Sequence, residues 1–384
     1  MYARELELPE RSFFLFGPRG TGKTTWLRSI LGGAHWFDLL LDRELVRLTR
    51  APGRFTEEVE ALPRGSWVVV DEVQRLPRLL NEVQDLLVRH PRRPRFALTG
   101  SSARKLRRGE ANLLAGRAVN RRFFPLTAGE LGRDFDVDAI LRFGCLPGVC
   151  AEHEAARIDV LEAYAENYLT QEIRHEALVK NLESFTRFLE VAALVNAQVT
   201  NVAGIARDAG VARPTVQGYF EILVDTLVGT WLPAWRPRAK VKELAHPKFY
   251  FFDTGAVRAL GGRLREPLGD EERGRLLETY VLHELRAHLN RSGCGGRLSY
   301  WRTPAGSEVD FVWTRAARAV GVEVKASQRW RRGDGAALSE LHREKRIRRA
   351  FGVYLGRERL RDGPVLVLPI RAFLESLCGG DVIG

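Results

Sequence analysis

The stretch "FFLFGPRGTGKTT", residues 13–25, decides how the N-terminal part of this 384-residue chain folds. Four apolar residues typical of a buried strand lead into a loop that fits G-x-x-x-x-G-K-[ST], and a helix is expected to follow. Glycines in such a loop let backbone N–H groups close around phosphates, Lys23 reaches the β- and γ-phosphates, and the Thr24 hydroxyl ligates Mg²⁺. The stretch therefore predicts an ATP site formed by Gly17, Pro18, Arg19, Gly20, Thr21, Gly22, Lys23, Thr24 and Thr25.

A second strand, "WVVVDEVQ" at 67–74, supplies the acids that such a site needs. Asp71 is expected to hold Mg²⁺ through water and so to belong to the ATP site, and Glu72 is placed to activate the attacking water. An acidic pair at a strand end is common by itself, but downstream of a phosphate loop it becomes a strong signal. We therefore expect Lys23 and Glu72 to be catalytic.

A further strand ends in polar residues, and an arginine-rich segment follows it. Thr99, Ser101 and Ser102 would lie at the same sheet edge and sense a γ-phosphate, although serines after a strand also cap helices. An arginine can neutralise charge in the transition state, in cis or from a neighbouring subunit, and our choice for this role is Arg117. The other arginines of the segment are expected on the solvated surface.

The chain as a whole reads as an α/β protein with three domains. Strands and helices alternate from Ser12 to Arg133, which indicates a parallel sheet covered by helices. The pattern then becomes helical, and strand-like runs return after a proline-rich basic stretch. The predicted division is a P-loop domain (1–134), a helical segment with a winged helix-turn-helix (135–240) and an α/β nuclease-like domain (241–384).

The middle segment contains the pattern of a helix-turn-helix. The stretch 200–229 reads as two helices joined at "AGVAR", where Gly210 permits the turn and Pro214 begins the second helix. A strand and a basic run follow, as in the wing of a winged helix. The residues expected to contact DNA are Arg213, Thr215, Gln217, Tyr219, Arg236, Arg238, Lys240 and Lys242. Winged helices also serve as ATPase lids or protein contacts, and that alternative stays open.

Near the C-terminus, "EVDFVW" and "VGVEVKA" carry an acid–acid–lysine pattern. Alternation places Glu308 and Asp310 on one face of their strand, and Glu323 and Lys325 on one face of theirs. If these strands pair, the three acids and the lysine converge. Hard oxygen ligands from Asp310 and Glu323 suit Mg²⁺ or Mn²⁺, while Lys325 would orient water or stabilise charge. Alternating acidic residues often mark only the solvent-exposed face of a strand. The apolar neighbours of Asp310 and Glu323 argue against this interpretation here.

Composition sets limits on the function classes. The net charge of +12 and the pI near 9.9 favour binding to nucleic acid or another anionic surface, although an arginine-rich codon bias gives the same excess. No apolar run approaches the length of a membrane span, and the N-terminus lacks the apolar core of a secretory signal. Four scattered cysteines argue against zinc and disulfides, so we expect a cytoplasmic protein.

Taken together, these blocks resemble a widespread bacterial and archaeal family of AAA-type ATPases with a winged helix and a C-terminal PD-(D/E)XK nuclease-like domain. The landmarks are "GPRGTGKTT", "VVVDEVQ", "LTGSS", "LLAGR", "FPLTAGEL", "GCLPGV", "YLTQEIR", "HPKFYFFDTG", "SEVDFVW" and "VEVK". The resemblance implies an ATPase site at Lys23, Thr24, Asp71 and Glu72, and a nuclease-type site at Asp310, Glu323, Lys325 and Glu278. Cys145 departs from the family pattern, in which a second glycine is usual.

Three functions compete. The leading hypothesis is a DNA-stimulated ATPase that remodels or translocates branched or damaged DNA in recombination or repair. It would act as a homo-oligomer, for example as a ring of subunits, and metal-dependent cleavage would be a second activity. The alternative is an ATP-dependent switch that binds DNA or a protein without cutting or moving along DNA. The third is a nuclease whose ATPase only gates access. ATP and Mg²⁺ are the expected cofactors in each case.

Overall fold

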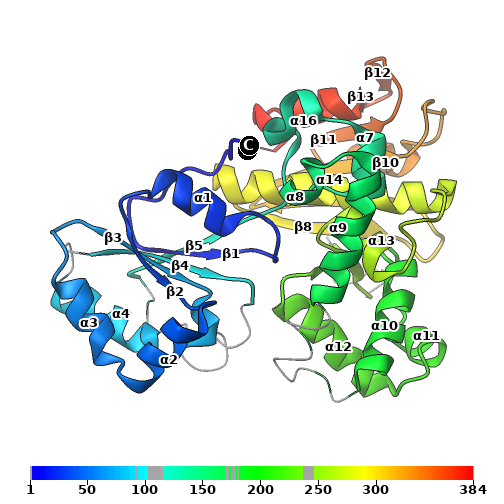
Figure 1. Ribbon diagram of the computed structural model, residues 1–384. Coiled ribbons are helices and arrows are strands. Elements are labelled where there is room, and N and C mark those ends of the chain that lie inside the picture. Colours follow the sequence, from blue (N-terminus) through cyan, green and yellow to red (C-terminus); the bar gives the residue numbers. More distant parts are fainter. Residues whose placement is uncertain are drawn as a thin grey trace. The chain divides into compact units, whose positions relative to one another are not determined.

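The computed structural model describes residues 2–90, 94–102, 114, 116–168, 173, 179, 181–236 and 246–383 (Figure 1). The chain divides into two compact units. The smaller unit comprises 4–124 and 225–228, and the larger comprises 1–3, 125–224 and 229–384. The helical middle segment and the C-terminal strands thus belong to one unit, and the division into three domains stays a prediction.

The smaller unit is built on a five-stranded sheet in which every neighbouring pair is parallel. Its strands are β1 (Phe13–Phe16), β2 (His35–Asp38), β3 (Trp67–Asp71), β4 (Arg95–Gly100) and β5 (Val119–Arg122). Their order across the sheet is β2-β3-β4-β1-β5. The predicted parallel α/β sheet is therefore confirmed, and the carboxyl ends of β1, β3 and β4 meet at one edge.

Helices cover both faces of this sheet, as Figure 1 shows. The helices are α1 (Lys23–Ile30), α2 (Asp42–Arg50), α3 (Gly53–Glu60) and α4 (Leu79–Arg89). Side chains alternate along a strand, so Phe13 and Leu15 pack with Trp26 of α1. Phe14 points to the opposite face, where it joins the apolar side chains of α2, α3 and α4. Burial on both faces explains why the strands are almost continuously apolar.

Short helices and a two-stranded sheet form the first part of the larger unit. The helices are α6 (Ala128–Leu131), α7 (Val137–Phe143), α8 (Pro147–Cys150), α9 (Glu154–Asn167), α10 (Leu182–Leu194), α11 (Val202–Asp208) and α12 (Arg213–Asp225). After α12, β6 (Gly229–Leu232) pairs antiparallel with β7 (Lys248–Phe251). Helices α11 and α12 occupy the predicted stretch, and Gly210 between them has a φ of 66°.

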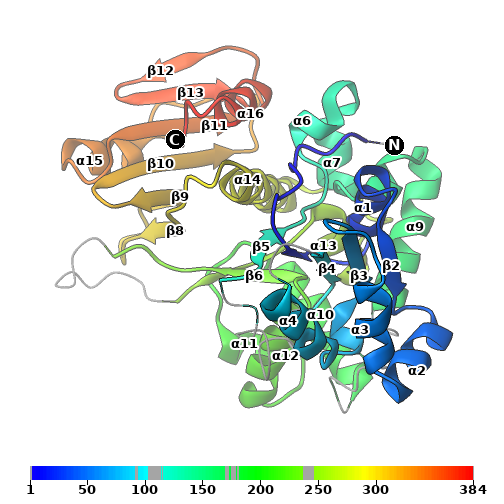
Figure 2. The same cartoon turned by 90° about the vertical axis from the view of Figure 1, so that its left-hand side faces the viewer.

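The C-terminal part is a six-stranded mixed sheet in the order β12-β13-β11-β10-β9-β8. Its strands are β8 (Arg297–Arg302), β9 (Glu308–Arg315), β10 (Arg318–Lys325), β11 (Arg349–Tyr354), β12 (Leu360–Asp362) and β13 (Val365–Pro369). The helices of this part are α13 (Thr254–Leu260), α14 (Asp270–Ser292), α15 (Ala336–Arg343) and α16 (Ile370–Cys378) (Figure 2). Strands β8 and β9 pair antiparallel, and the expected pairing of β9 with β10 is confirmed.

Gly144 and Asp253 fix the junction between α7 and the segment that leads into α8. Gly144 has a φ of 74°, and a Cβ atom there would overlap the carboxylate of Asp253. That carboxylate accepts hydrogen bonds from the backbone N–H of Cys145 at 2.7 Å and of Ala256, at the start of α13, at 2.9 Å. Burial raises the pKa of Asp253 to about 6. The junction therefore requires glycine at 144 but only a backbone donor at 145.

Candidate functional site

The phosphate loop joins β1 to α1 in a conformation that depends on its glycines. Gly20 and Gly22 have φ values of 81° and 88°, which L side chains rarely adopt. Gly17 lies so close to the backbone just after β5 that a Cβ atom would overlap the carbonyl oxygen of Phe123. No side chain caps the N-terminus of α1, and its first turn holds no acid. These features leave an N-terminus suited to an anion such as a phosphate.

Two side chains of the loop take the places that ATP chemistry requires. Lys23 is buried, and its Nζ donates to the carbonyl oxygens of Gly17 at 2.7 Å and Pro18 at 3.1 Å. The Thr24 hydroxyl donates to Asp71 Oδ2 at 2.8 Å, so the two predicted Mg²⁺ partners lie together. Arg19, Gly20 and Thr25 are exposed. The donors around the loop and the paired oxygens of Thr24 and Asp71 fit a nucleotide with its Mg²⁺.

Asp71 is fully buried at the end of β3 and is held from two sides. Besides Thr24, the hydroxyl of Thr99 on β4 donates to the other carboxylate oxygen. Burial raises the pKa of Asp71, and the hydrogen bonds from Thr99 and Thr24 oppose that rise. Thr99 was predicted as a γ-phosphate sensor; in the described structure it positions the predicted metal-holding carboxylate.

Glu72 carries the most constrained geometry of the site. Its φ is 57°, a left-handed conformation that is uncommon outside glycine. Its N–H donates to the Thr99 hydroxyl at 2.9 Å, and its carboxylate accepts from the Ser101 hydroxyl at 2.9 Å and from the Gln74 amide. Gln74 is a residue that sequence reasoning missed, although it is the last letter of "VVVDEVQ". The structure thus links Asp71, Thr99, Glu72 and Ser101 in one network at the carboxyl edge of the sheet.

The predicted arginine finger, Arg117, does not belong to this hydrogen-bond network. Arg117 is exposed, and its backbone N–H donates to the carbonyl oxygen of Leu114. An exposed side chain is available to a neighbouring subunit. Its role stays a prediction.

In the C-terminal sheet, the predicted acids do come together, and they share an unexpected lysine. Asp310 and Glu323 are buried on the paired strands β9 and β10. Asp310 Oδ2 accepts from the N–H of Val324 at 2.8 Å, and Lys325 Nζ lies 2.5 Å from Glu323 Oε1. Lys248 of β7 is also buried, with its Nζ 3.9 Å from Asp310 Oδ1. The predicted triad is thus one cluster with a second cation.

Glu278 and Glu308 complete this cluster on the side of Lys248. Glu278 Oε2 accepts from Lys248 Nζ at 3.3 Å and from the Tyr250 hydroxyl at 3.1 Å. Glu308 Oε1 lies 2.5 Å from Lys248 Nζ, and its other oxygen lies 3.4 Å from Arg302 Nη1. Sequence reasoning missed Lys248, although a lysine that opens the apolar run "KFYFF" is as conspicuous as an acid in "VDFVW".

Burial and mutual repulsion dominate the electrostatics of the acids. Burial raises the pKa of Glu278 to about 7, with repulsion from Asp310 as the next cause. The same two causes raise the pKa of Glu323 well above its usual range, and burial also raises that of Asp310. Lys248 and Lys325 counteract these shifts because each favours the ionised carboxylates beside it. The cluster is therefore short of positive charge.

In the described residues, no three His, Cys, Asp or Glu side chains are arranged to hold a metal ion as they stand. The donor chemistry nevertheless fits Mg²⁺ or Mn²⁺, since carboxylate oxygens are the ligands these ions prefer. Glu323 Oε2 is buried and has no hydrogen-bond partner, so one oxygen is free for a cation. Asp310, Glu323 and Glu278 would be its holders.

The helix-turn-helix residues divide into exposed and buried ones. Arg213, Thr215 and Gln217 are exposed at the start of α12, as expected for contacts with a ligand. Tyr219 corrects the prediction: its side chain is 7% exposed and its ring packs against Phe185 and Phe188 of α10. It falls on the same stripe as Val216 and Phe220, so it stabilises the helix packing.

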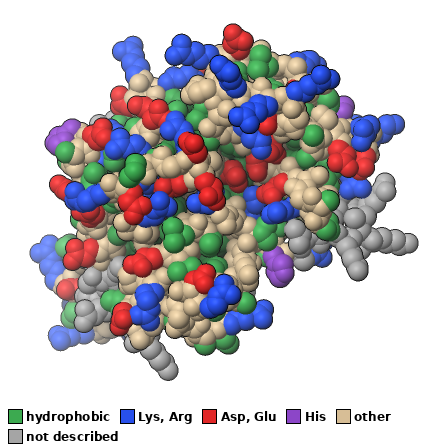
Figure 3. All heavy atoms as spheres, turned by 90° about the vertical axis from the view of Figure 1, so that its right-hand side faces the viewer, with side chains coloured by type: hydrophobic (Ala, Val, Ile, Leu, Met, Phe, Trp, Pro, Cys, Tyr) green, Lys and Arg blue, Asp and Glu red, His purple; other side chains and the backbone are tan. Residues whose placement is uncertain are grey.

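The basic segment after β6 is described only at its beginning. Arg236 is exposed, while Arg238, Lys240 and Lys242 lie outside the described residues. On the face drawn in Figure 3, Lys and Arg side chains are interspersed with Asp and Glu. The net charge of +12 therefore does not by itself locate a binding surface. Across the described ranges, no helix has the length and apolar character needed to cross a membrane.

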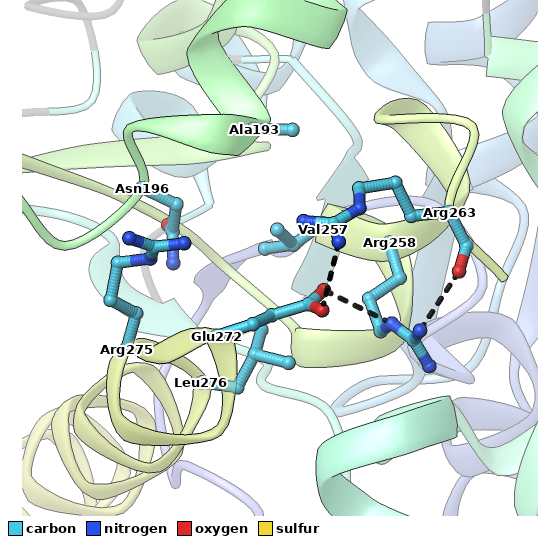
Figure 4. Close-up of a pocket in the computed structure, with 8 residues that line it drawn as sticks. All are labelled: Ala193, Asn196, Val257, Arg258, Arg263, Glu272, Arg275 and Leu276. Atoms are coloured by element: carbon cyan, nitrogen blue, oxygen red, sulfur yellow. Dashed lines mark hydrogen bonds and ion pairs between the residues drawn. The ribbon is translucent and has the colours of Figure 1, made fainter. Parts of the chain in front are cut away.

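A pocket between α10, α13 and α14 contains a buried ion pair, drawn in Figure 4. The Arg258 side chain is 0% exposed, and its Nε donates to Glu272 Oε1 at 3.2 Å. Its Nη2 donates to the carbonyl oxygens of Arg263 at 2.8 Å and Glu266 at 2.6 Å. Burial lowers the pKa of Arg258. These contacts tie α13 to α14, and we assign the pair a structural role.

Comparison with known families divides the chain into three consecutive matches. Residues 9–132 match the family described as AAA domain. Residues 134–267 match a domain of unknown function (DUF8612), and residues 273–373 match another (DUF4143). Among whole proteins, uncharacterized proteins of Mycobacterium tuberculosis and Mycobacterium bovis are each 28% identical over 316 residues, covering 81% of this chain and 69% of theirs.

Two solved structures show weak likeness to the chain. The ORC1 protein of Aeropyrum pernix in complex with DNA is 15% identical with a TM-score of 0.34, over 68% of this chain and 87% of that one. A variant of RuvB from Thermotoga maritima is 17% identical with a TM-score of 0.30, over 58% of this chain and 82% of that one. Likenesses this weak carry no argument. Residues 9–132 therefore match an AAA domain, and the geometry of the phosphate loop agrees with this match.

Proposed function

We propose that this protein is an ATPase that engages DNA and couples ATP turnover to remodelling of branched or damaged DNA. The observation that carries the proposal is the network at the carboxyl edge of the parallel sheet. There Thr24, Asp71 and Glu72 are joined through Thr99 in one set of hydrogen bonds, and Lys23 precedes Thr24 in the phosphate loop. This arrangement has a phosphate-binding lysine, oxygens for Mg²⁺ and a carboxylate base, which are the parts that phosphoryl transfer to water requires.

Each residue has a defined task in this proposal. The backbone N–H groups of the loop and Lys23 bind and orient the phosphates, and Thr24 and Asp71 hold Mg²⁺. That ion, when bound, supplies charge neutralisation for the transferred phosphoryl group. Glu72 accepts a proton from the attacking water once its carboxylate is free of Ser101 and Gln74. Arg117 of a neighbouring subunit would complete the site, which motivates the proposal of a homo-oligomer.

Contact with DNA is assigned to the segment α11–α12 and the strands β6 and β7 that follow it. This order of elements is that of a winged helix, and it supports the assignment. Arg213, Thr215 and Gln217 are exposed at the N-terminal end of α12, where a recognition helix meets base edges and phosphates. The net charge of +12 adds a sequence-independent attraction to phosphate.

The C-terminal sheet is proposed to be nuclease-like, with Asp310, Glu323 and Glu278 as metal holders and Lys325 beside them. Buried acids on two paired strands with an adjacent lysine support this assignment. Metal-dependent cleavage would be a second activity in recombination or repair. If it exists, Asp310→Ala and Lys325→Ala should each abolish Mg²⁺-dependent cleavage while ATP binding persists.

The proposal is tested by steady-state ATPase assays with and without forked or four-way DNA. Wild-type turnover should rise with DNA, Lys23→Met should abolish it because the phosphates lose their cation, and Arg213→Ala with Gln217→Ala should remove the stimulation. Arg265→Ala is the matched control, since the Arg265 side chain is 67% exposed and lies outside this segment. Absence of both DNA stimulation and DNA binding would refute the proposal.

A second function is favoured by one observation. The carboxylate of Glu72 is engaged by Ser101 and Gln74, which is the state of a switch that waits for a partner. The protein would then bind a promoter or a protein in an ATP-dependent manner without moving along DNA. A slow ATPase combined with a sequence-specific footprint would support the switch, whereas unwinding of branched DNA would exclude it.

A further inference from the structure

Lys248 stands at the centre of the acidic cluster in the larger unit. It opens β7, and its side chain is 4% exposed. Its Nζ lies 2.5 Å from Glu308 Oε1, 3.3 Å from Glu278 Oε2 and 3.9 Å from Asp310 Oδ1. One buried ammonium therefore contacts the carboxylate of Glu278 on α14 and those of Glu308 and Asp310 on β9.

The distances from Lys248 Nζ to the carboxylate oxygens distinguish a site for an ammonium from a site for a divalent metal ion. Divalent Mg²⁺ and Ca²⁺ take oxygen ligands at roughly 2.0–2.6 Å, and their ligands must lie close together. Around Lys248, the Glu278 and Asp310 oxygens lie 3.3 and 3.9 Å from the nitrogen, which is too far for ligands of one such ion at that point. The Tyr250 hydroxyl, from the same strand, adds a hydrogen bond to Glu278. The acids on this side are thus spaced for an ammonium.

A second observation points to a cation beside the lysine. Glu323 Oε1 is paired with Lys325, but its Oε2 is buried and has no hydrogen-bond partner. A buried carboxylate oxygen without a donor is costly unless something positive can reach it. Asp310 lies between the Lys248 side and the Glu323 side of the cluster. Its Oδ1 faces Lys248, and its Oδ2 accepts a hydrogen bond from the N–H of Val324.

We propose that Lys248 is the built-in counter-ion of this site and that it competes with a divalent cation for Asp310. With no metal bound, the ammonium neutralises Glu278, Glu308 and Asp310. A divalent cation on Asp310 and Glu323 would lie close to this ammonium, so the two positive charges repel each other. Metal binding then requires Lys248 to withdraw toward Glu308. The inference rests on the proposed metal site.

The test is a Mn²⁺ titration of the full-length protein, in which free Mn²⁺ is followed by electron paramagnetic resonance. Lys248→Met keeps the length of the side chain and removes its charge. We expect this variant to bind Mn²⁺ about ten- to a hundredfold more tightly than the wild type, because a nearby positive charge is gone. Lys345→Met is the matched control: Lys345 is exposed after α15, and its removal should leave the affinity unchanged.

A variant with balanced charge keeps the test decisive if Lys248→Met fails to fold. Lys248→Met combined with Glu308→Gln removes one positive and one negative charge from the closest pair and leaves Asp310, Glu323 and Glu278 in place. It should also bind Mn²⁺ more tightly than the wild type, and Mn²⁺ should raise its melting temperature by more than it raises that of the wild type. Adding Asp310→Asn should cancel both effects.

The outcomes separate the two proposals. If the wild type binds Mn²⁺ and neither Lys248 variant binds more tightly, Lys248 does not compete and the inference is overturned. If none of the proteins binds Mn²⁺, the metal site and the inference fall together. Tighter binding in either Lys248 variant, lost with Asp310→Asn, supports both.

Discussion

Replacing Ser101 with alanine should raise the basal ATPase rate of this protein. The Ser101 hydroxyl donates to Glu72 Oε2 at 2.9 Å, and the Gln74 amide donates to the same oxygen. A hydrogen bond from a neutral donor to a charged group contributes about 1.5–3 kcal/mol, and the half-buried position of Glu72 places this bond at the low end. About 1.4 kcal/mol shifts an equilibrium tenfold, so the free carboxylate should become up to about tenfold more populated.

The assay is phosphate release at saturating ATP and Mg²⁺ without DNA. Ser101→Ala should turn over ATP between about three- and tenfold faster than the wild type, since the Gln74 bond remains. Ser29→Ala is the matched control, because Ser29 is exposed and its hydroxyl donates to the backbone of Trp26 and not to Glu72. Glu72→Gln in the Ser101→Ala background should return the rate to background. A Ser101→Ala rate equal to or below that of the wild type would refute the reasoning and show that Ser101 holds Glu72 in its working position.

Three further predictions concern the larger unit. Gly144→Ala should destabilise it by at least about 3 kcal/mol in urea unfolding, because the φ of 74° and the overlap with Asp253 act together. In the control Gly148→Ala, the added Cβ meets no neighbouring atom, so the free energy of unfolding should change by less than about 1 kcal/mol. Equal unfolding midpoints for the two variants would contradict this prediction. The pKa of Asp253, raised by burial to about 6, means that the folded state binds more protons than the unfolded state between about pH 4 and 6. Its contribution to stability therefore falls by about 3 kcal/mol as the pH rises through that window, and Asp253→Asn should remove this part of the pH dependence, which a set of urea titrations at pH 4 and pH 7 measures. Glu272→Gln leaves the buried guanidinium of Arg258 without its anion and should cost about 3–5 kcal/mol in the same unfolding assay, and a loss below about 1 kcal/mol would show that the pair is dispensable.

The elements that carry the predicted ATP site could be placed from the sequence because they are local. The loop, the strand before it and the helix after it are contiguous, and Asp71 follows from a second strand of the same parallel sheet. Thr99 and Ser101 were placed at the correct edge for the same reason. Their partners were not predictable, since the left-handed turn at Glu72 that brings its carboxylate to Ser101 has no signature in the sequence.

The acidic cluster was predicted less completely because it is assembled over a long sequence separation. Asp310, Glu323 and Lys325 follow from strand alternation, and the antiparallel pairing of the strands β9 and β10 that carry them is confirmed. Lys248 lies far upstream, and only the folded chain shows which acids it meets. Tyr219 failed for a different reason: a position three residues after Val216 belongs to the buried stripe of α12, and that periodicity outweighs the polar hydroxyl.

The position of Lys248 on β7 has a consequence for how this chain can be cut into pieces. The second uncharacterized family match begins at residue 273, so a fragment taken at that boundary keeps Glu278, Glu308, Asp310 and Glu323 but discards Lys248 and Tyr250. Such a fragment would retain four acids against Lys325 and Arg302, and it would also lose the bridge between Ala234 and Tyr300 that attaches the chain after β6 to β8. The boundary of the family match therefore differs from the boundary of the smallest fragment that keeps these contacts. Fragments made to express the C-terminal sheet should begin before β6.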